Sequence, residues 1–205
     1  MPHTRFALLA VVASVALAAC GGSPETAGTS PTAPVALSPS ASAAPTATTV
    51  NPCLLVTQEE ASQLAGTTFK AGKEEAISSS SSMCTYGAQT LNVFTVEVAV
   101  APDAATAQAD WAQEEAQAQA GLQQLVAEAG GSVQLTAGDI TLSGADKAAA
   151  ATASKNISGR TLSISAIYVL KGAVFFTFAD LVLGKQAPAT LAMEAQAQTV
   201  LTRVP

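Results

Sequence analysis

Residues 161–183 read TLSISAIYVLKGAVFFTFADLVL, and this stretch decides the fold that the sequence predicts. Thr161–Leu170 and Ala173–Leu183 are apolar runs rich in β-branched and aromatic residues, which favour strands. Between them, Lys171 and Gly172 form a two-residue connection, and a glycine there can take the positive φ that a tight hairpin turn needs. The second run is apolar at odd and even positions alike. It therefore predicts a central strand that is buried on both faces.

Segments on either side of this hairpin add further strands and helices. Asn92–Val100 alternates apolar and polar residues with a period of two, which predicts another strand, paired through a turn near Gly87-Ala88-Gln89. A helical stripe of apolar residues predicts a long helix from Pro102-Asp103 to about Ala129. Shorter strand candidates follow it, at 133–137, 140–142 and 148–154.

Two more helices are predicted at the ends of this region. Thr57 and Glu60 have the spacing of a capping box, which predicts a short helix over 58–65 with Gly66 at its C-terminal end. Pro188 suits the first turn of a C-terminal helix that reaches Arg203. Its expected buried stripe is Met193, Ala197, Val200, Leu201 and Val204.

The order of these elements predicts the fold class. Strands joined by short turns favour antiparallel pairing, and the helices alternate with groups of strands. We expect an α+β fold over residues 51–205, in which one long helix and one C-terminal helix pack on a mainly antiparallel sheet. This length suits a single domain with one core.

The N-terminus has the features of an export signal. Arg5 precedes a 12-residue apolar run, Phe6–Leu17, which is shorter than the roughly 20 residues that a membrane-spanning helix needs. Leu17-Ala18-Ala19-Cys20 resembles the lipobox of bacterial lipoproteins. The resemblance implies cleavage after residue 19, a diacylglyceryl group on Cys20, and a chain anchored by lipid at the extracytoplasmic face of the cell membrane. An ordinary secretory signal with a chance cysteine is the alternative.

The composition of residues 20–50 predicts a flexible tether. The segment contains five prolines, many Ser, Thr and Ala residues and a single charge at Glu25, so it cannot bury enough apolar surface to fold. A flexible chain of this length has a root-mean-square reach of roughly 30 Å. A glycosylated stalk has the same composition and remains an alternative.

Three cysteines, Cys20, Cys53 and Cys84, leave one unpaired if the other two form a disulfide. Lipidation would remove Cys20 from thiol chemistry and leave an even pair in an oxidising place. We therefore predict a Cys53–Cys84 disulfide within the domain. Two buried free thiols are the alternative.

Three short motifs carry a further resemblance. NPCLLVT at 51–57, MCTY at 83–86 and SGAD at 143–146 together resemble a family of small actinobacterial lipoproteins. That family has no established activity and supplies no catalytic residues. The resemblance supports the disulfide and the surface location.

Charge and histidine content narrow the function classes. The net charge is −6 and the basic residues are dispersed, which argues against a nucleic-acid partner. The single histidine, His3, lies in the signal segment, so the mature chain lacks the histidine of a Ser-His-Asp, Cys-His or Cys/His zinc site. We predict no catalytic residues, no metal and no cofactor.

Two residues stand out as candidates for a ligand pocket. Trp111 lies in the middle of the long helix, and Asp180 shares a strand face with Val174, Phe176 and Phe178. The simpler interpretations are a core tryptophan and a strand-end aspartate that faces water or pairs with a lysine. Asp139, Asp146 and Glu97 come from other segments, and two of these four carboxylates could converge in a cleft.

We expect a non-catalytic binding domain, anchored in the cell envelope, for a small or lipidic ligand or for an envelope protein. The alternatives are an envelope hydrolase that uses two such carboxylates and a purely structural or sensory component.

Overall fold

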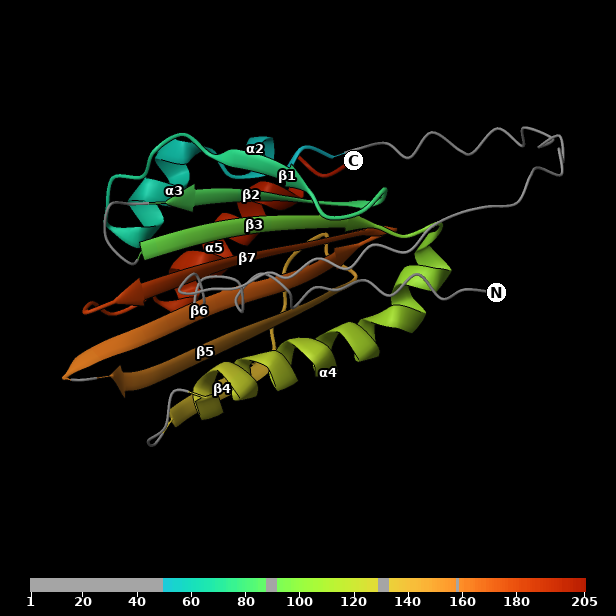
Figure 1. Cartoon of the computed structure of the whole chain (residues 1–205). Helices are drawn as coiled ribbons and strands as arrows, with labels where there is room; N and C mark the ends of the chain where they lie inside the picture. Colours follow the sequence, from blue (N-terminus) through green and yellow to red (C-terminus); the bar gives the residue numbers. More distant parts are fainter. Residues whose placement is uncertain (1–49, 88–91, 129–132, 158) are drawn as a thin grey trace, which may run out of the picture.

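Seven antiparallel strands form one sheet in the computed structural model, which describes residues 50–87, 92–128, 133–157 and 159–205 (Figure 1). The strand order is β1-β2-β3-β7-β6-β5-β4, so β7 is central, as predicted. Cys20, with the rest of the predicted signal and tether up to residue 49, lies outside the described residues, and so do Ala88 and Gln89 of the predicted turn. The strands are β1 Lys73–Ala76, β2 Ser81–Gly87, β3 Asn92–Val100, β4 Val133–Asp139, β5 Lys147–Ile157, β6 Arg160–Lys171 and β7 Val174–Leu183.

Two meanders meet at the centre of the sheet. Strands β1 to β3 form one and strands β4 to β7 form the other, and β3 pairs with β7. Helix α4, Ala104–Glu128, connects them. The predicted mainly antiparallel sheet is therefore confirmed, including the β6–β7 hairpin, in which Gly172 has a φ of 58°.

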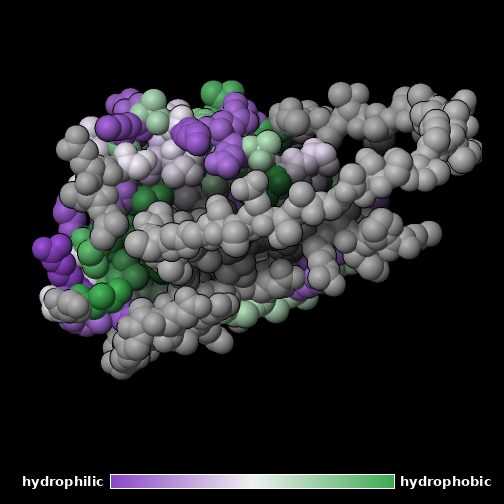
Figure 2. Space-filling model, viewed as in Figure 1, coloured by the Kyte–Doolittle hydropathy of each residue, from purple (hydrophilic) through white to green (hydrophobic). Residues whose placement is uncertain are grey.

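Two strand predictions differ from the structure. Residues 140–142 are not a strand, although the Ile140 amide still donates to the Ala148 carbonyl at 3.0 Å. Strand β1 was not predicted, because its sequence KEEA is short, charged and exposed and has no apolar alternation. A charged edge strand of this kind discourages pairing with other chains. Figure 2 shows hydrophilic residues gathered over α3 and β1.

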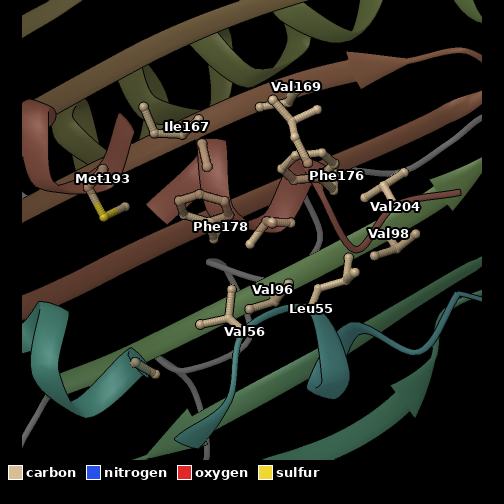
Figure 3. Packing of buried hydrophobic residues seen from close by; sticks show 14 of the residues in the cluster. Leu55, Val56, Val96, Val98, Ile167, Val169, Phe176, Phe178, Met193 and Val204 are labelled. Atoms are coloured by element: carbon tan, nitrogen blue, oxygen red, sulfur yellow. The ribbon is translucent and has the colours of Figure 1, made fainter. Parts of the chain in front are cut away.

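Three helices lie on one side of the sheet: α2 Pro52–Leu55, α3 Gln58–Ala65 and α5 Thr190–Leu201. The main core fills the space between them and the strands (Figure 3). We call this side of the sheet the helix-covered face. The predicted stripe of α5 is buried, from Met193 to Val204. Helix α5 begins at Thr190, so Pro188 precedes the N-cap residue Ala189 and does not occupy the first turn as predicted.

Helix α4 packs on the opposite face. Ala107 and Trp111 contact a smaller cluster that includes Leu170 and Phe175. No helix among the described residues is long and apolar enough to cross a membrane.

A disulfide and a capping box fix the first helices. Cys53 and Cys84 are bonded, with Cα atoms 5.1 Å apart, which confirms the predicted pair and ties α2 to β2. Thr57 Oγ accepts from the Glu60 amide, and Glu60 accepts from the Thr57 amide, as the sequence predicts. Gly66 ends α3 in the left-handed region at a φ of 58°.

Candidate functional site

Trp111 is a core residue in this structure. It is 5% exposed and stacks on Phe175, with ring centroids 6.3 Å apart and planes 9° apart. The cavity beside it measures about 20 Å³. Pockets for small molecules usually measure ~300 Å³ or more, so this space does not admit a ligand.

Asp180 lies on the other face of the sheet, so the two predicted pocket residues do not share a site. Phe176 and Phe178, which share its face, belong to the core under α5, whereas Trp111 packs on Phe175. Asp180 is 1% exposed, and neither carboxylate oxygen has a hydrogen-bond partner in the described structure. It therefore neither faces water nor pairs with a lysine.

Burial has an electrostatic consequence for this group. Desolvation raises the pKa of Asp180 to about 6, because a charged carboxylate loses the hydration that water would give it. Buried polar groups nearly always have a hydrogen-bond partner. An unpartnered carboxyl in the centre of the sheet therefore requires an explanation.

Asp180 belongs to a cluster that we call the polar island: Asn92, Ser163, Ser165 and Asp180. All four are at most 5% exposed. Ser165 lies directly opposite Asp180 in the register, and directly opposed side chains have Cβ atoms about 5 Å apart. Asn92 on β3 and Ser163 on β6 are its diagonal neighbours on the same face. The island thus spans three adjacent strands of the helix-covered face.

The polar island is rich in acceptors. Four buried side-chain nitrogen or oxygen atoms in the described part of the chain have no partner, and three of them are Asn92 Oδ1 and the two Asp180 oxygens. The fourth, Gln196 Nε2, lies on α5 beside Glu60. Three buried acceptors without a partner therefore lie close together in the polar island.

A cavity of about 260 Å³ lies next to the island. We call it the hydroxyl pocket, because β4, β5, β6 and the start of α5 contribute five hydroxyl-bearing side chains to its wall. Ser163 belongs to both the pocket and the island. The segment 186–189 also lines the pocket. The hydroxyl residues are Thr136, Thr152, Ser154, Ser163 and Thr190.

Helix α5 begins at this pocket without a side-chain cap. Its N-cap residue is Ala189, which has no side-chain acceptor. The first N–H groups of a helix have no intrahelical partner and carry the positive end of the helix dipole. The Thr190 N–H is one of them, and Thr190 lines the pocket. The start of α5 therefore adds N–H donors to the pocket wall, whereas Asn92 and Asp180 do not line the pocket and meet it only through their neighbour Ser163.

A second cavity, of about 220 Å³, lies at the turn before β2, where Ser78–Ser82 and Glu74 line it together with apolar residues such as Val98 and Val100. Its polar groups already have partners: the Ser80 amide donates to Ser78 Oγ at 3.2 Å, and Asn51 donates to Glu74 at 2.7 Å. None of the unpartnered buried atoms of the described chain lies there. The hydroxyl pocket is the stronger candidate site.

The other candidate carboxylates do not converge. Glu97 and Asp139 share a face and a row of the register, but three strands separate them, which is about 19 Å at the usual strand spacing. Asp146 lies in an exposed turn and accepts from the Gly172 amide at 2.6 Å. Asp180 faces the opposite side. These four described carboxylates therefore do not form the pair that the hydrolase alternative needs.

The sequence analysis named Asp180 as a candidate pocket residue, but it did not predict the polar residues that surround it. Ser163 and Ser165 interrupt the apolar alternation of β6 at two successive inward positions, and this was the available signal. The sequence around Thr136 and Thr190 has no such interruption. These two residues line the same pocket only because the tertiary fold brings β4 and α5 together. No family model, curated protein or solved structure among those compared matches this chain.

Proposed function

We propose that this chain is a lipid-anchored protein of the extracytoplasmic membrane face whose domain binds a small polar ligand, without catalysis, in the hydroxyl pocket. The observation that carries the ligand site is the set of three unpartnered buried acceptors beside a polar cavity. The anchor rests on the lipobox-like LAAC at 17–20 and the tether-like composition that follows it. The chemistry of Cys20 remains part of the proposal.

A polar ligand is favoured over a lipidic one. The apolar space beside Trp111 measures about 20 Å³, too little for an acyl chain. The hydroxyl pocket is lined mainly by hydroxyl groups and backbone. Hydroxyl and backbone groups both donate and accept hydrogen bonds, so they favour a polar ligand that can do the same.

A protein partner has less support. The large exposed hydrophobic residues of the described chain are Leu54, 71% exposed, and Leu191, 77% exposed. Leu191 begins α5, whereas Leu54 lies near its other end, where Arg203 donates to the Leu55 carbonyl. The length of α5 puts roughly 18 Å between these ends, so the two leucines do not form one patch.

The ligand proposal is tested by identifying what the protein retains. Wild type and a Thr136→Trp variant are purified from the native membrane, and the bound small molecules are identified by mass spectrometry. Thr136 is exposed on the edge strand β4, so the larger ring enters the pocket without disturbing the core. Thr141→Trp, also exposed, is the matched control. We expect to find a small molecule that wild type and the Thr141→Trp control retain and that Thr136→Trp loses. The proposal is contradicted if wild type retains no small molecule, or if all three proteins retain the same molecules.

The anchor has its own test. Detergent phase partitioning of wild type and Cys20→Ser should place wild type in the detergent phase and the variant in the aqueous phase. Wild type in the aqueous phase would contradict the lipid anchor and leave the pocket proposal standing.

A further inference from the structure

We infer that the ligand of the hydroxyl pocket is a neutral, polyhydroxylated small molecule of about the size of one sugar ring. This inference rests on the proposed ligand site and names the class of ligand. The shared chemistry is a compact carbon skeleton that carries several hydroxyl groups and no charge. A sugar ring and an open-chain polyol both have it.

The wall of the hydroxyl pocket selects a neutral ligand. None of the described residues that line it has a charged side chain. Apart from the five hydroxyl residues, the polar side chain of the wall is the amide of Gln186, in the segment that precedes α5. A charged group that entered this cavity would lose hydration without meeting an opposite charge, which is unfavourable.

Four of the hydroxyl residues form a grid on the helix-covered face of the sheet. In the register, Thr136 lies opposite Thr152, and Ser154 lies opposite Ser163. Directly opposed side chains have Cβ atoms about 5 Å apart, and the two residues of β5, which are i and i+2, are about 7 Å apart along the strand. The grid therefore extends in two directions over about the area of one ring with its hydroxyl groups.

A second surface of the pocket comes from Thr190 and the segment 186–189. Thr190 adds the fifth hydroxyl group, and Gln186 adds an amide that both donates and accepts. A hydroxyl group of the ligand also donates and accepts, so it can pair with either kind of atom on the wall. A molecule with hydroxyl groups on several carbons can thus bond to the sheet and to this segment together.

The size and the apolar content of the pocket fit the same class. The volume of about 260 Å³ lies just below the ~300 Å³ at which pockets for drug-sized ligands begin, so a single ring fills it. The described wall has no aromatic residue. Its one large apolar residue is Ile164, whose side chain packs with Ala151 and Ala153 on the α4 side of the sheet. An apolar ring would therefore bury little apolar surface here.

Binding of small probes to the purified full chain by isothermal titration calorimetry tests the inference. D-Glucose and D-galactose present the sugar ring, and sorbitol presents the open chain. Cyclohexanol keeps a six-membered ring with one hydroxyl group, and glucuronate adds a carboxylate to the sugar. We expect at least one neutral polyol to bind about tenfold or more tightly than cyclohexanol and glucuronate, a ratio that corresponds to one or two net hydrogen bonds. Tighter binding of a sugar identifies the ring as the source, and tighter binding of sorbitol identifies the open chain.

A variant that removes one hydroxyl group locates the binding. Thr152→Val keeps the shape of the side chain and should weaken the bound polyol about three- to tenfold, as the loss of one net hydrogen bond does. Thr95→Val is the matched control, because Thr95 is also a half-buried threonine within a strand, on the opposite face of the sheet. The control should bind the polyol as wild type does.

Three results would overturn the inference. They are the absence of binding of all three neutral polyols to wild type, equally tight binding of cyclohexanol or glucuronate, and wild-type affinity in Thr152→Val. In each of these cases a retained molecule that Thr136→Trp loses would still support the hydroxyl pocket as a ligand site, with another chemistry. If wild type retains no small molecule either, the proposed function fails as well.

Discussion

At the scale of single residues, the buried carboxyl of Asp180 makes the stability of the fold depend on pH. Its carboxyl is buried without a partner and has a pKa raised to about 6. Because the folded state holds the proton more tightly than the unfolded chain, this group lowers the stability as pH rises from about 4 through 6. Its burial in the ligand-free protein is therefore unfavourable at neutral pH, as is often found at binding sites.

Asp180→Asn should stabilise the ligand-free chain at pH 7.5 by about 2–3 kcal/mol, since a shift of one pKa unit corresponds to ~1.4 kcal/mol. At pH 2.5 the variant and wild type should have nearly equal free energies of unfolding, because the carboxyl, whose ordinary pKa is 3.8, is then neutral in the folded and the unfolded state. Urea unfolding across this pH range measures the difference. A difference that does not change with pH would contradict the buried, unpartnered carboxyl.

Gly72 is the second residue with a specific structural role. A Cβ atom there would lie 2.5 Å from Cys84 Sγ and 2.6 Å from Cε1 of Tyr86. Gly72→Ala should therefore destabilise the protein by about 1–3 kcal/mol, as overpacking of a core does. Gly138→Ala meets nothing within 4 Å and should be close to neutral. Thermal unfolding compares the two; equal effects would show that the space around Gly72 can adjust.

At the scale of elements, an ion pair joins α3 to the end of α5. Glu60 Oε1 and Arg203 Nη2 lie 2.5 Å apart, and Arg203 Nη1 also donates to the Leu55 carbonyl. The hydrogen bond from Arg203 lowers the pKa of Glu60 to about 2. Because the folded pKa is lowered, the stability from this pair is present above about pH 4.5 and is lost as pH falls toward 2.

Glu60→Gln tests this contact while keeping an acceptor for the capping box. We expect a loss of about 1 kcal/mol at pH 7, since the pair is partly exposed and screened, and a much smaller difference at pH 2, close to the lowered pKa of Glu60. Glu59→Gln, on the exposed side of the same helix, is the control. Urea unfolding at several salt concentrations measures these free energies of unfolding. A loss of stability in Glu59→Gln as large as that in Glu60→Gln would contradict a specific ion pair between Glu60 and Arg203.

The sequence predicted those elements that have a local signal. The β6–β7 hairpin follows from two apolar runs around Lys171 and Gly172, and α3 follows from Thr57, Glu60 and Gly66, which are all within ten residues. Strand β1 could not be predicted, because pairing with β2 rather than its own sequence makes KEEA extended. The hydroxyl pocket likewise depends on β4, β6 and α5 meeting in space, which no local pattern encodes.

At the scale of the whole molecule, the disulfide fits an exported domain. Cys53 and Cys84 are 31 residues apart, and closing such a loop contributes about 3–4 kcal/mol in the chain-entropy model. The bond also fixes α2 against β2, beside the residues that follow the tether-like segment. This bond would keep the domain folded in the oxidising compartment that the proposed export implies.

A Cys53→Ser, Cys84→Ser variant should therefore lose about 3–4 kcal/mol of stability. Urea unfolding of wild type with and without reductant should give the same difference, and reductant should not affect the variant. Because the bond is on the β2 side of the sheet, away from the hydroxyl pocket, probe binding by the folded variant should be unchanged. Loss of binding in a variant that is still folded would contradict this separation.

The central claim is that a small polar ligand binds in the hydroxyl pocket, where β4, β5, β6 and the start of α5 meet. Backbone ¹H–¹⁵N NMR spectra of the full chain, titrated with the molecule that wild type retains and Thr136→Trp loses, test it most directly. The account predicts that the largest shifts occur at Thr152, Ser163 and Thr190 and that Thr136→Trp strongly reduces them. Shifts centred on Ser78–Ser82, or no shifts, would contradict it.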